Sequence, residues 1–351
     1  MKKFILSTAA AVMAMSCASD IDMNDIRISS YKDGKDCAVS LTFDDGMKEH
    51  YTIVAPELEK RGWRGTFWLC CAWIHDDPQI DTTHITWQEA VEMAHNGHEM
   101  SNHSWSHPNL TQLPAEEALK EIRLNDEAIE KHIGIKPLTF CFPYNSYNDE
   151  AVAMAMEGRI GARLKEFWLG GQHSPMDYLH KQIEDAIAAG SWIAGMTHGI
   201  NYGYDCYEDP SEFTAFLDYL KSMEDKVWVG TFREVAAYTK AAAGTTLSFK
   251  ERGRKVIIEP STDLDPELYG GLLTMEMPCT DMGIQAQQDK KDLADAVLAV
   301  AENEDIKRVR LSSLEPELIT DEMIDKLASC KKLCSHFHLA LQSGCDQTLK
   351  R

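Results

Sequence analysis

The chain has 351 residues, of which 44% are hydrophobic and 26% are charged. This length suits two domains, or one large α/β barrel with an extension, and the composition excludes an intrinsically disordered protein. The formal net charge of −21 argues against nucleic acid as a partner, because phosphate would be repelled. Ten cysteines are too few for a disulfide scaffold, and none has the paired spacing of a zinc ribbon.

Residues 1–17 have the pattern of a bacterial lipoprotein signal peptide. Two lysines precede a mostly apolar run over 4–15, which is too short for a permanent membrane span. The segment Ala14-Met15-Ser16-Cys17 resembles a lipobox, whose cysteine is lipidated after cleavage. We therefore expect a protein of the bacterial cell envelope, periplasmic or surface-exposed, held to the membrane by a lipid on Cys17. An ordinary secretory peptide is the alternative.

Between residues 36 and 240, short apolar runs alternate with amphipathic stretches, an order typical of a parallel sheet or barrel. The strands are expected at 38–43, 65–69, 98–101, 138–142, 191–196 and 227–230. The helices are expected at 51–60, 87–96 (with Thr86 as N-cap), 114–132 and 211–222. In barrels the chemistry gathers at the C-terminal ends of the strands.

After an alanine-rich stretch that ends at Gly244, residues 245–291 are expected to form a small all-β appendage. Its strands are predicted at 247–249, 255–258, 272–277 and 284–288. From residue 292 the pattern returns to alternating helix and strand.

Acids or histidines follow three of the predicted strands. Asp44 and Asp45 follow the first strand, His103 and His107 the third, and His198 the strand at 191–196. Histidines four residues apart would point the same way on one turn of helix. Two imidazoles and one carboxylate leave coordination positions open, which is typical of a catalytic metal site. Successive strand residues face opposite sides, so we expect Asp44 and Asp45 to divide the roles of base and ligand unless the turn reorients them.

Each of these clusters has an ordinary explanation when it stands alone. An Asp-Asp-Gly is usually a turn, and two histidines four apart are often a solvated helix face. It is their order, each at a strand end, that indicates a site. The remaining histidines lack such neighbours and are interpreted as surface or core residues: His50, His75, His84, His95, His98, His132, His173 and His180.

Four ordered motifs carry a resemblance to a known family: Leu-Thr-Phe-Asp-Asp-Gly at 41–46, His-Ser-Trp-Ser-His at 103–107, Phe-Pro-Tyr at 142–144 and Met-Thr-His at 196–198. Together they resemble the polysaccharide deacetylases, the family-four carbohydrate esterases. The resemblance covers about 36–240, within a domain expected at 36–244. It implies a distorted (β/α) barrel and an enzyme that removes N- or O-acetyl groups from polysaccharide or oligosaccharide.

The resemblance also implies roles for individual residues. A divalent metal, with Zn expected and Co, Ni or Mn as alternatives, would be held by Asp45, His103 and His107. Asp44 would be the general base, His198 would protonate the leaving amine or alcohol, and the Tyr144 backbone N–H would hold the oxyanion. The residues expected to contact the sugar are Trp105, Pro143 and Met196, with Trp73, Trp168, Tyr202 and Tyr204 as further aromatic candidates.

One position departs from the family pattern. The third motif usually begins with an arginine that pairs with the base, and this chain has Cys141 there. A thiol cannot form a bidentate ion pair, so either another arginine, with Arg163 as the candidate, takes its place or Asp44 is oriented differently. The acid behind His198 is also unassigned, with Asp177 and Asp205 as candidates. Two alternatives stay open: a catalytically impaired carbohydrate-binding lipoprotein, and a metal-dependent amidase acting on a non-sugar amide.

Residues 292–351 show a second resemblance. The segments 308–316 and 336–344 resemble an internal piece of the radical-SAM tRNA methylthiotransferases. Those enzymes need a Cys-x3-Cys-x2-Cys motif, but after Cys330 and Cys334 position 337 is Phe, so no iron–sulfur cluster is expected here. We interpret this tail as the remnant of a fusion or of a sequence join near Lys291. A genuine docking module is the alternative.

Overall fold

The computed structural model describes residues 2–7, 11–16, 23–171, 174–252, 255–277, 284–288, 324, 327–330 and 332–333. The chain divides into two compact units, Met1–Gln285 and Ala286–Arg351. Most of the second unit lies outside the described residues, and with it the helix and strand pattern expected from residue 292. Cys17 and Cys334 also lie outside the described residues.

A curved parallel sheet of eight strands forms the centre of the first unit. Its order is β8-β7-β6-β5-β4-β10-β9, and β11 also pairs with β4. The strands are β4 (Cys37–Phe43), β5 (Thr66–Leu69), β6 (Glu99–Asn102), β7 (Thr139–Cys141), β8 (Gly161–Arg163), β9 (Phe167–Trp168), β10 (Trp192–Thr197) and β11 (Val227–Val229). Because every pairing in this sheet is parallel, the C-terminal ends of the strands meet at one edge.

Strand β4 is the middle of this sheet and is buried along its whole length. It pairs with β10 over residues 38–43, with β5 at 42–43 and with β11 at 37–39. Its odd-numbered residues belong to the large apolar core, while Thr42 on the other face lies beside Arg163. A strand covered on both faces reads as a continuous apolar run, which is why residues 38–43 were readily predicted as a strand.

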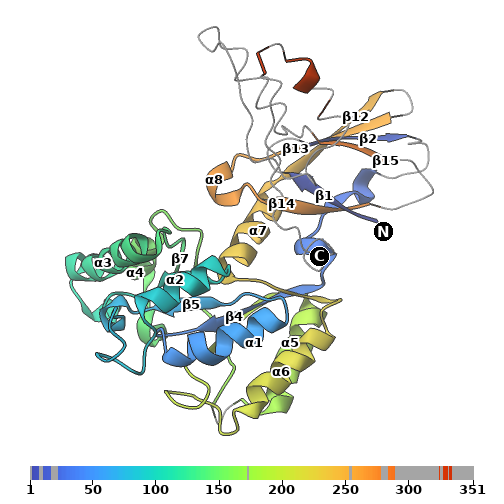
Figure 1. Cartoon of the computed structure of the whole chain (residues 1–351). Helices are drawn as coiled ribbons and strands as arrows, with labels where there is room; N and C mark the ends of the chain where they lie inside the picture. Colours follow the sequence, from blue (N-terminus) through green and yellow to red (C-terminus); the bar gives the residue numbers. More distant parts are fainter. Residues whose placement is uncertain are drawn as a thin grey trace. The chain divides into compact units, whose positions relative to one another are not determined.

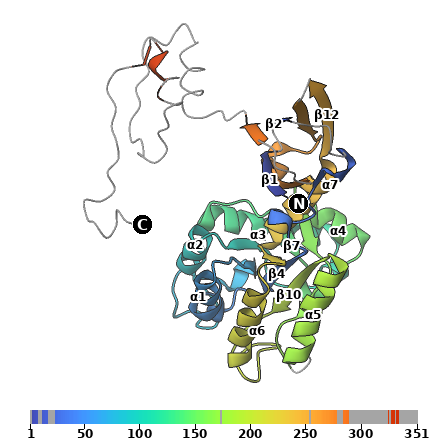
Figure 2. The same ribbon diagram turned by 90° about the vertical axis from the view of Figure 1, so that its right-hand side faces the viewer.

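Helices surround this sheet, as Figures 1 and 2 show from two sides. They are α1 (Ala55–Lys60), α2 (Trp87–His95), α3 (Ala115–Ile133), α4 (Asp149–Ala155), α5 (Met176–Ala189), α6 (Ser211–Ser222) and α7 (Phe232–Gly244). Helix α2 begins with a capping box in which the Thr86 hydroxyl accepts from the Glu89 N–H and the Glu89 carboxylate accepts from the Thr86 N–H. The curved parallel sheet, together with the helices around it, confirms the expected distorted (β/α) barrel.

Several elements differ from the sequence-based expectation. The helix expected at 51–60 is a π-helical turn, His50–Val54, followed by the short α1. Strands β8 and β9 and helices α4 and α5 were not predicted. Strands of two or three residues are too short to show an alternating pattern, so only pairing reveals them.

The appendage consists of two small antiparallel sheets, of order β1-β14-β3 and β12-β13-β2-β15. Its strands are β1 (Lys2–Ser7), β2 (Ala11–Ser16), β3 (Arg27–Ile28), β12 (Thr246–Arg252), β13 (Lys255–Ser261), β14 (Leu272–Met277) and β15 (Ile284–Gln288). The expectation of an all-β appendage missed the short helix α8 (Pro266–Tyr269). It also missed that β1 pairs with β14 and β2 with β13, so a cleaved leader would take two strands out of these sheets.

Tyr238 on α7 links the appendage to the barrel. Its hydroxyl donates to the Ser29 carbonyl (3.2 Å) and accepts from the Thr274 N–H of β14 (3.1 Å). Among the described helices, none combines the length and apolar character needed to cross a membrane.

Candidate active site

The two adjacent aspartates at the end of β4 both face one cavity. Asp44 continues the line of the strand, with its N–H bonded to the Thr197 carbonyl of β10 (3.2 Å). Asp45 has left-handed backbone angles (φ +78°), and Gly46 follows with φ +76°. This turn reverses the alternation that would otherwise send the second carboxylate to the opposite side. The reorientation that the sequence left open therefore occurs at Asp45.

His103 and His107 converge by a route that the spacing did not predict. The segment after β6 is a loop rather than a helical turn, with left-handed backbone at Ser104 (φ +68°) and His107 (φ +60°). The Asn102 side chain accepts from the Ser104 N–H (2.8 Å), and the Ser104 hydroxyl accepts from the His107 N–H (3.1 Å). These bonds hold the two rings 4.9 Å apart, centre to centre. The argument from one turn of helix was wrong, although the two rings do lie together.

Asp45, His103 and His107 form a set of donors suited to a divalent metal. Asp45 Oδ1 is 3.6 Å from Nε2 of each histidine, and the three ligand atoms all lie within 4.8 Å of one another. His103 Nδ1 donates to the Cys141 carbonyl (2.8 Å), so its Nε2 carries the lone pair that a metal requires. Burial lowers the pKa of both histidines, that of His107 to about 4, and keeps the rings neutral. The residues therefore fit a metal by donor type, spacing and protonation.

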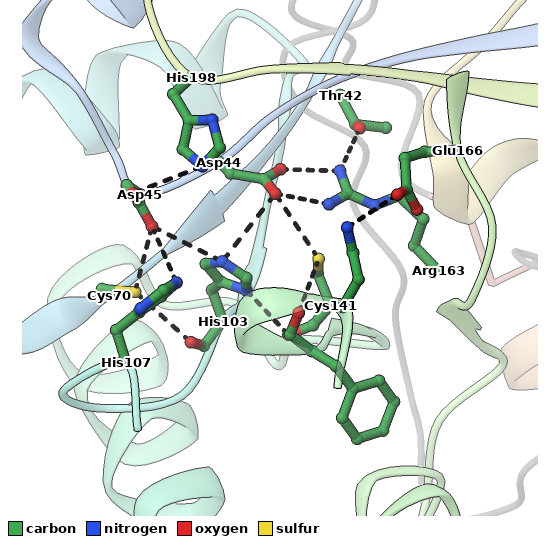
Figure 3. A network of polar contacts seen from close by, with 12 residues as sticks. Thr42, Asp44, Asp45, Cys70, His103, His107, Cys141, Arg163, Glu166 and His198 are labelled. Atoms are coloured by element: carbon green, nitrogen blue, oxygen red, sulfur yellow. Dashed lines mark hydrogen bonds and ion pairs between the residues drawn. The ribbon is translucent and has the colours of Figure 1, made fainter. Parts of the chain in front are cut away.

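Asp44 is held by Arg163, the candidate replacement for the arginine missing at Cys141. Arg163 Nη1 donates to Asp44 Oδ1 (2.7 Å) and Nη2 to Oδ2, while Nη1 also donates to the Thr42 hydroxyl (2.6 Å). The Cys141 thiol lies beside the same carboxylate (Sγ to Oδ2, 3.9 Å). Figure 3 shows Asp44 between Arg163 and His103. The arginine thus comes from β8 instead of from β7.

The charges around Asp44 keep it ionised. Burial raises the pKa of this carboxyl group, but the Arg163 guanidinium and then His103 outweigh the burial and hold the pKa well below its usual range. Asp44 itself raises the pKa of Arg163 against the effect of burial. Burial raises the pKa of the Cys141 thiol well above its ordinary value, so this residue stays neutral beside the ion pair.

His198 is backed by Asp205, the second of the two acids considered for this role. Asp205 Oδ1 accepts from His198 Nδ1 (3.0 Å) and from the His198 N–H (3.1 Å), whereas Asp177 lies exposed in the first turn of α5. His198 Nε2 faces Asp45 Oδ2 at 3.7 Å. Burial lowers the pKa of this imidazole, but the Asp205 hydrogen bond and then Asp44 raise it to about 9 overall.

Tyr144 has left-handed backbone angles (φ +58°), lines the cavity and is 67% exposed as a residue. Within the described part of the chain, no acceptor pairs with its backbone N–H. The next residue, Asn145, is also left-handed (φ +50°), and its side chain donates to Glu166 (2.7 Å). A turn held in this way offers a free N–H donor at the cavity.

These groups line one cavity of about 550 Å³. Its lining residues are Asp44, Asp45, His103, His107, Phe142, Tyr144, Asn145, Trp168, Met196, His198 and Tyr204. Among the residues expected to contact a sugar, Met196, Trp168 and Tyr204 line the cavity. Asn145 was missed, because a single amide in a loop carries no pattern.

The other aromatic candidates lie elsewhere. Trp105 packs partly buried against the apolar core, and Pro143 is buried. The Trp73 ring lies against His107 (5.6 Å between ring centres), and the Tyr202 hydroxyl donates to the Thr83 carbonyl (3.2 Å). None of these four residues is part of the cavity lining within the described chain. The position of Trp105 between the two histidines therefore did not place its ring in the cavity.

Comparison with known proteins agrees with this geometry. The family model described as polysaccharide deacetylase matches residues 31–159. These residues, just over a third of the chain, are similar to the polysaccharide deacetylases. The resemblance to this family is confirmed, and residues of all four motifs that carry it line the cavity.

The chain is similar to the peptidoglycan-N-acetylmuramic acid deacetylase PdaC of Bacillus subtilis (strain 168). The two are 35% identical over 113 residues, which are 32% of this chain and 22% of the relative. The solved structure of the peptidoglycan deacetylase PdaC from Bacillus subtilis has 26% sequence identity and a TM-score of 0.39, and the match covers 57% of this chain and 89% of that one.

The chain is also similar in part to the tRNA-2-methylthio-N(6)-dimethylallyladenosine synthase of Alkaliphilus oremlandii (strain OhILAs). The identity is 33% over 103 residues, 29% of this chain and 22% of the relative. The partial similarity expected to such enzymes is thus confirmed. The chain spans about a fifth of the length of these two curated relatives.

Proposed function

We propose that the protein is a metal-dependent deacetylase that hydrolyses N- or O-acetyl groups of a polysaccharide or oligosaccharide at the bacterial cell envelope. One observation carries the proposal. A metal-ligand set (Asp45, His103, His107), a base held by an arginine (Asp44) and an acid-backed histidine (His198) line a single cavity. Each has a separate task in acyl transfer to water.

A divalent cation held by this ligand set would polarise the acetyl carbonyl and acidify the attacking water, so that even a weakly basic carboxylate can take its proton. Zinc is the metal proposed, and cobalt, nickel and manganese would suit the same nitrogen and oxygen donors. The ligand histidines stay neutral because both are buried. No iron–sulfur cluster is proposed.

The protein's own residues supply the proton transfers. Asp44 is ionised by its contact with Arg163 and takes the proton of the attacking water. The free N–H of Tyr144 donates to the oxygen that becomes negative as the carbonyl is attacked, a contact that is typically worth about 3–4 kcal/mol in the transition state. His198 keeps its Nδ1–H on Asp205 and presents Nε2 to the cavity. The hydrogen bond to Asp205 favours the protonated ring, which donates its proton to the leaving amine or alcohol.

The shape of the cavity supports a sugar substrate. The exposed residues Tyr144 (67%) and Tyr204 (73%) line the cavity, with Trp168 beside Tyr204 (6.3 Å between ring centres). Aromatic faces pack against the apolar faces of pyranose rings. Trp105 and Pro143, which do not line the cavity, would act on the substrate only through their neighbours.

The alternative of an impaired carbohydrate-binding protein rested on the cysteine at position 141. Arg163 provides the bidentate contact that Cys141 cannot, so the missing arginine at position 141 no longer argues for an impaired protein. The direct test is acetate release from acetylated chitin, peptidoglycan and xylan oligomers, with and without a chelator. Release that continues after the metal is stripped would contradict the mechanism. Release from a non-sugar amide alone would favour the amidase.

A further inference from the structure

Glu49 is a buried carboxylate that the proposed reaction does not use. It lies five residues after Asp44, at the start of the π-helical turn, and is only 6% exposed. Its Oε2 accepts from the backbone N–H groups of Ile200 (2.7 Å) and Asn201 (2.8 Å), and its Oε1 accepts from the Asn201 side chain (2.5 Å). All three donors belong to the loop that directly follows His198. A carboxylate that receives three N–H donors fixes the backbone that carries them.

The loop folds back closely on itself and approaches the segment that carries Glu49. A Cβ added to Gly199 would lie 1.9 Å from the Tyr202 carbonyl oxygen and 3.3 Å from Glu49 Oε2. Gly203 has φ +106°, and a Cβ there would meet Met47 at 3.1 Å. The segment after Asp45 and the loop after His198 therefore pack directly against each other.

His50 provides a second contact between the same two segments. Its Nε2 lies 2.6 Å from the His198 carbonyl oxygen and donates to it, since a carbonyl can only accept. The ring is fully buried beside Phe43 (5.7 Å) and Phe67 (5.3 Å), measured between ring centres. Because the ring is completely buried against this pair of phenyl rings, close packing restricts its rotation and keeps Nε2 on the carbonyl oxygen.

We propose that Glu49, together with His50, is a positioning residue that sets the place of the His198 imidazole relative to Asp45. The inference rests on the proposed function, in which His198 donates the proton to the leaving group. Glu49 and His50 belong to the same short segment as Asp45, so the metal-ligand side and the proton-donor side of the cavity are joined by a few bonds. We call the contacts of Glu49 and His50 with the loop after His198 the clamp. The clamp maintains the observed separation of 3.7 Å between Asp45 Oδ2 and His198 Nε2.

The clamp predicts which reactions depend on it. Loss of the carboxylate in Glu49→Ala frees the loop, so His198 is misplaced while Asp45, His103 and His107 keep their positions. Acetyl transfer from a sugar amine or alcohol needs a proton on the leaving group, whereas 4-nitrophenolate leaves without one. We expect Glu49→Ala to lower kcat on an acetylated amino sugar by about 100-fold, the lower end of what a general acid contributes, with KM little changed. Turnover of 4-nitrophenyl acetate and metal content should stay near the wild-type values.

The conservative variant serves as the rescue. In Glu49→Gln the side-chain oxygen can still accept from the two backbone N–H groups. The new amide NH2 then faces the Asn201 side chain, which can turn over and accept from it. Glu49→Gln should therefore keep most of the activity on the sugar substrate. Glu127→Ala, which removes an exposed carboxylate from α3, is the matched control and should change nothing.

The test combines these assays with an observation that needs no turnover. In full-length protein with 15N-labelled histidine, the ring signals of His198, assigned through His198→Gln, should shift or broaden in Glu49→Ala and not in Glu127→Ala. If Glu49→Ala does not fold, Glu49→Asp, with its shorter reach, replaces it. Unchanged His198 signals, or equal losses on both substrates, would overturn the proposal. If the wild type releases no acetate from any substrate, the proposed function fails, and the ring signals still decide whether Glu49 positions His198.

Discussion

Arg163, the last residue of β8, donates two parallel hydrogen bonds to Asp44, the first residue after β4. Both side chains are almost completely buried, with Arg163 1% and Asp44 3% exposed. The pair lies in the barrel interior beside Trp68, whose ring is 5.9 Å from the guanidinium carbon. Each charge depends on the other, because neither has water to replace its partner.

Replacing Arg163 by Met should therefore both destabilise the protein and inactivate it. Removing one partner of a buried ion pair costs about 3–5 kcal/mol, because the remaining charge stays unpaired. We expect urea unfolding to show a loss of this size and acetate release to fall by about 100-fold or more. Arg123→Met, at a side chain that is 61% exposed, is the matched control and should behave like the wild type.

A rescue distinguishes position from charge. In Arg163→Ala, adding Cys141→Arg puts a guanidinium on β7, next to the same carboxylate, because Cys141 Sγ is 3.9 Å from Asp44 Oδ2. Part of the activity should return in the double variant. No recovery in a folded, metal-loaded double variant would show that only an arginine from β8 can orient Asp44.

The metal set gives a second prediction. Asp45→Ala or His103→Ala should each remove bound metal and acetate release together, since three protein ligands are needed to hold the ion. Metal content by mass spectrometry and acetate release are the two measurements. His75→Ala, which changes a histidine outside the cavity lining, is the control. A variant that loses its metal and keeps its activity would refute the assignment.

His98 predicts how stability depends on pH. Its Nδ1 accepts from the Gly65 N–H (3.0 Å), and its Nε2 donates to Glu59 (3.0 Å), so the neutral ring has both nitrogens paired. Burial lowers the pKa of His98 below its ordinary 6.5, and the Glu59 hydrogen bond opposes this only in part. A second proton would have to sit on Nδ1, facing the Gly65 N–H.

The sign follows from this pKa. The unfolded chain, with the higher pKa, binds more protons between the two values, so the free energy of unfolding falls as the pH drops below about 6.5. Urea unfolding at pH 7.5 and pH 5.5 should show this loss, and His98→Gln should show less of it. An equal or larger loss in His98→Gln would contradict the assignment.

The N-terminal segment gives a prediction about location. We propose that Cys17 carries a lipid that holds the protein to the membrane of the cell envelope, so Cys17→Ser should move it to the soluble fraction. Membrane fractionation with an antibody against the protein is the measurement. Ser16→Ala, which changes the neighbouring residue of the lipobox-like segment and keeps the thiol, is the control. Unchanged membrane association of Cys17→Ser would contradict lipidation.

The tail gives the last prediction. We propose that residues 245–291 form an appendage. We propose that residues 292–351, which follow it, are a partial methylthiotransferase-like fragment without a function of its own. Deleting 292–351 should leave the melting temperature and acetate release unchanged. A lower melting temperature or a loss of activity would favour a docking module instead.

The sequence predicted those parts of the site that follow long apolar strands. Asp44 and Asp45 follow a buried strand of seven residues, and His198 follows one of six, so their place at the C-terminal edge could be inferred. The partners of these residues could be named only as candidates, without a pattern that favoured them. Arg163 ends a strand of only three residues, and Asp205 has a left-handed backbone (φ +56°) in a loop. Their positions depend on pairing and on turn geometry, which leave no period in the sequence.

Glu49 was missed for a different reason. An acid in an amphipathic stretch is ordinarily a solvated residue, and nothing in the neighbouring letters marks it as buried. Its burial results from the loop after His198, about 150 residues further along the chain. Similarly, His103 and His107 meet because of left-handed residues in a loop, and the four-residue spacing would have looked the same on a solvated helix.

Because the arginine comes from β8, homologous sequences cannot be classified as active or inactive from the third motif alone. A survey that scores the third motif letter by letter would meet Cys141 and set this chain aside as inactive. The guanidinium reaches the same carboxylate from Gly161-Ala162-Arg163, about twenty residues later in the chain. Homologues that lack the usual arginine could therefore be sorted by whether an arginine ends the next short strand. This would separate proteins in which that strand supplies the partner of the base aspartate from those that have lost the arginine–aspartate ion pair.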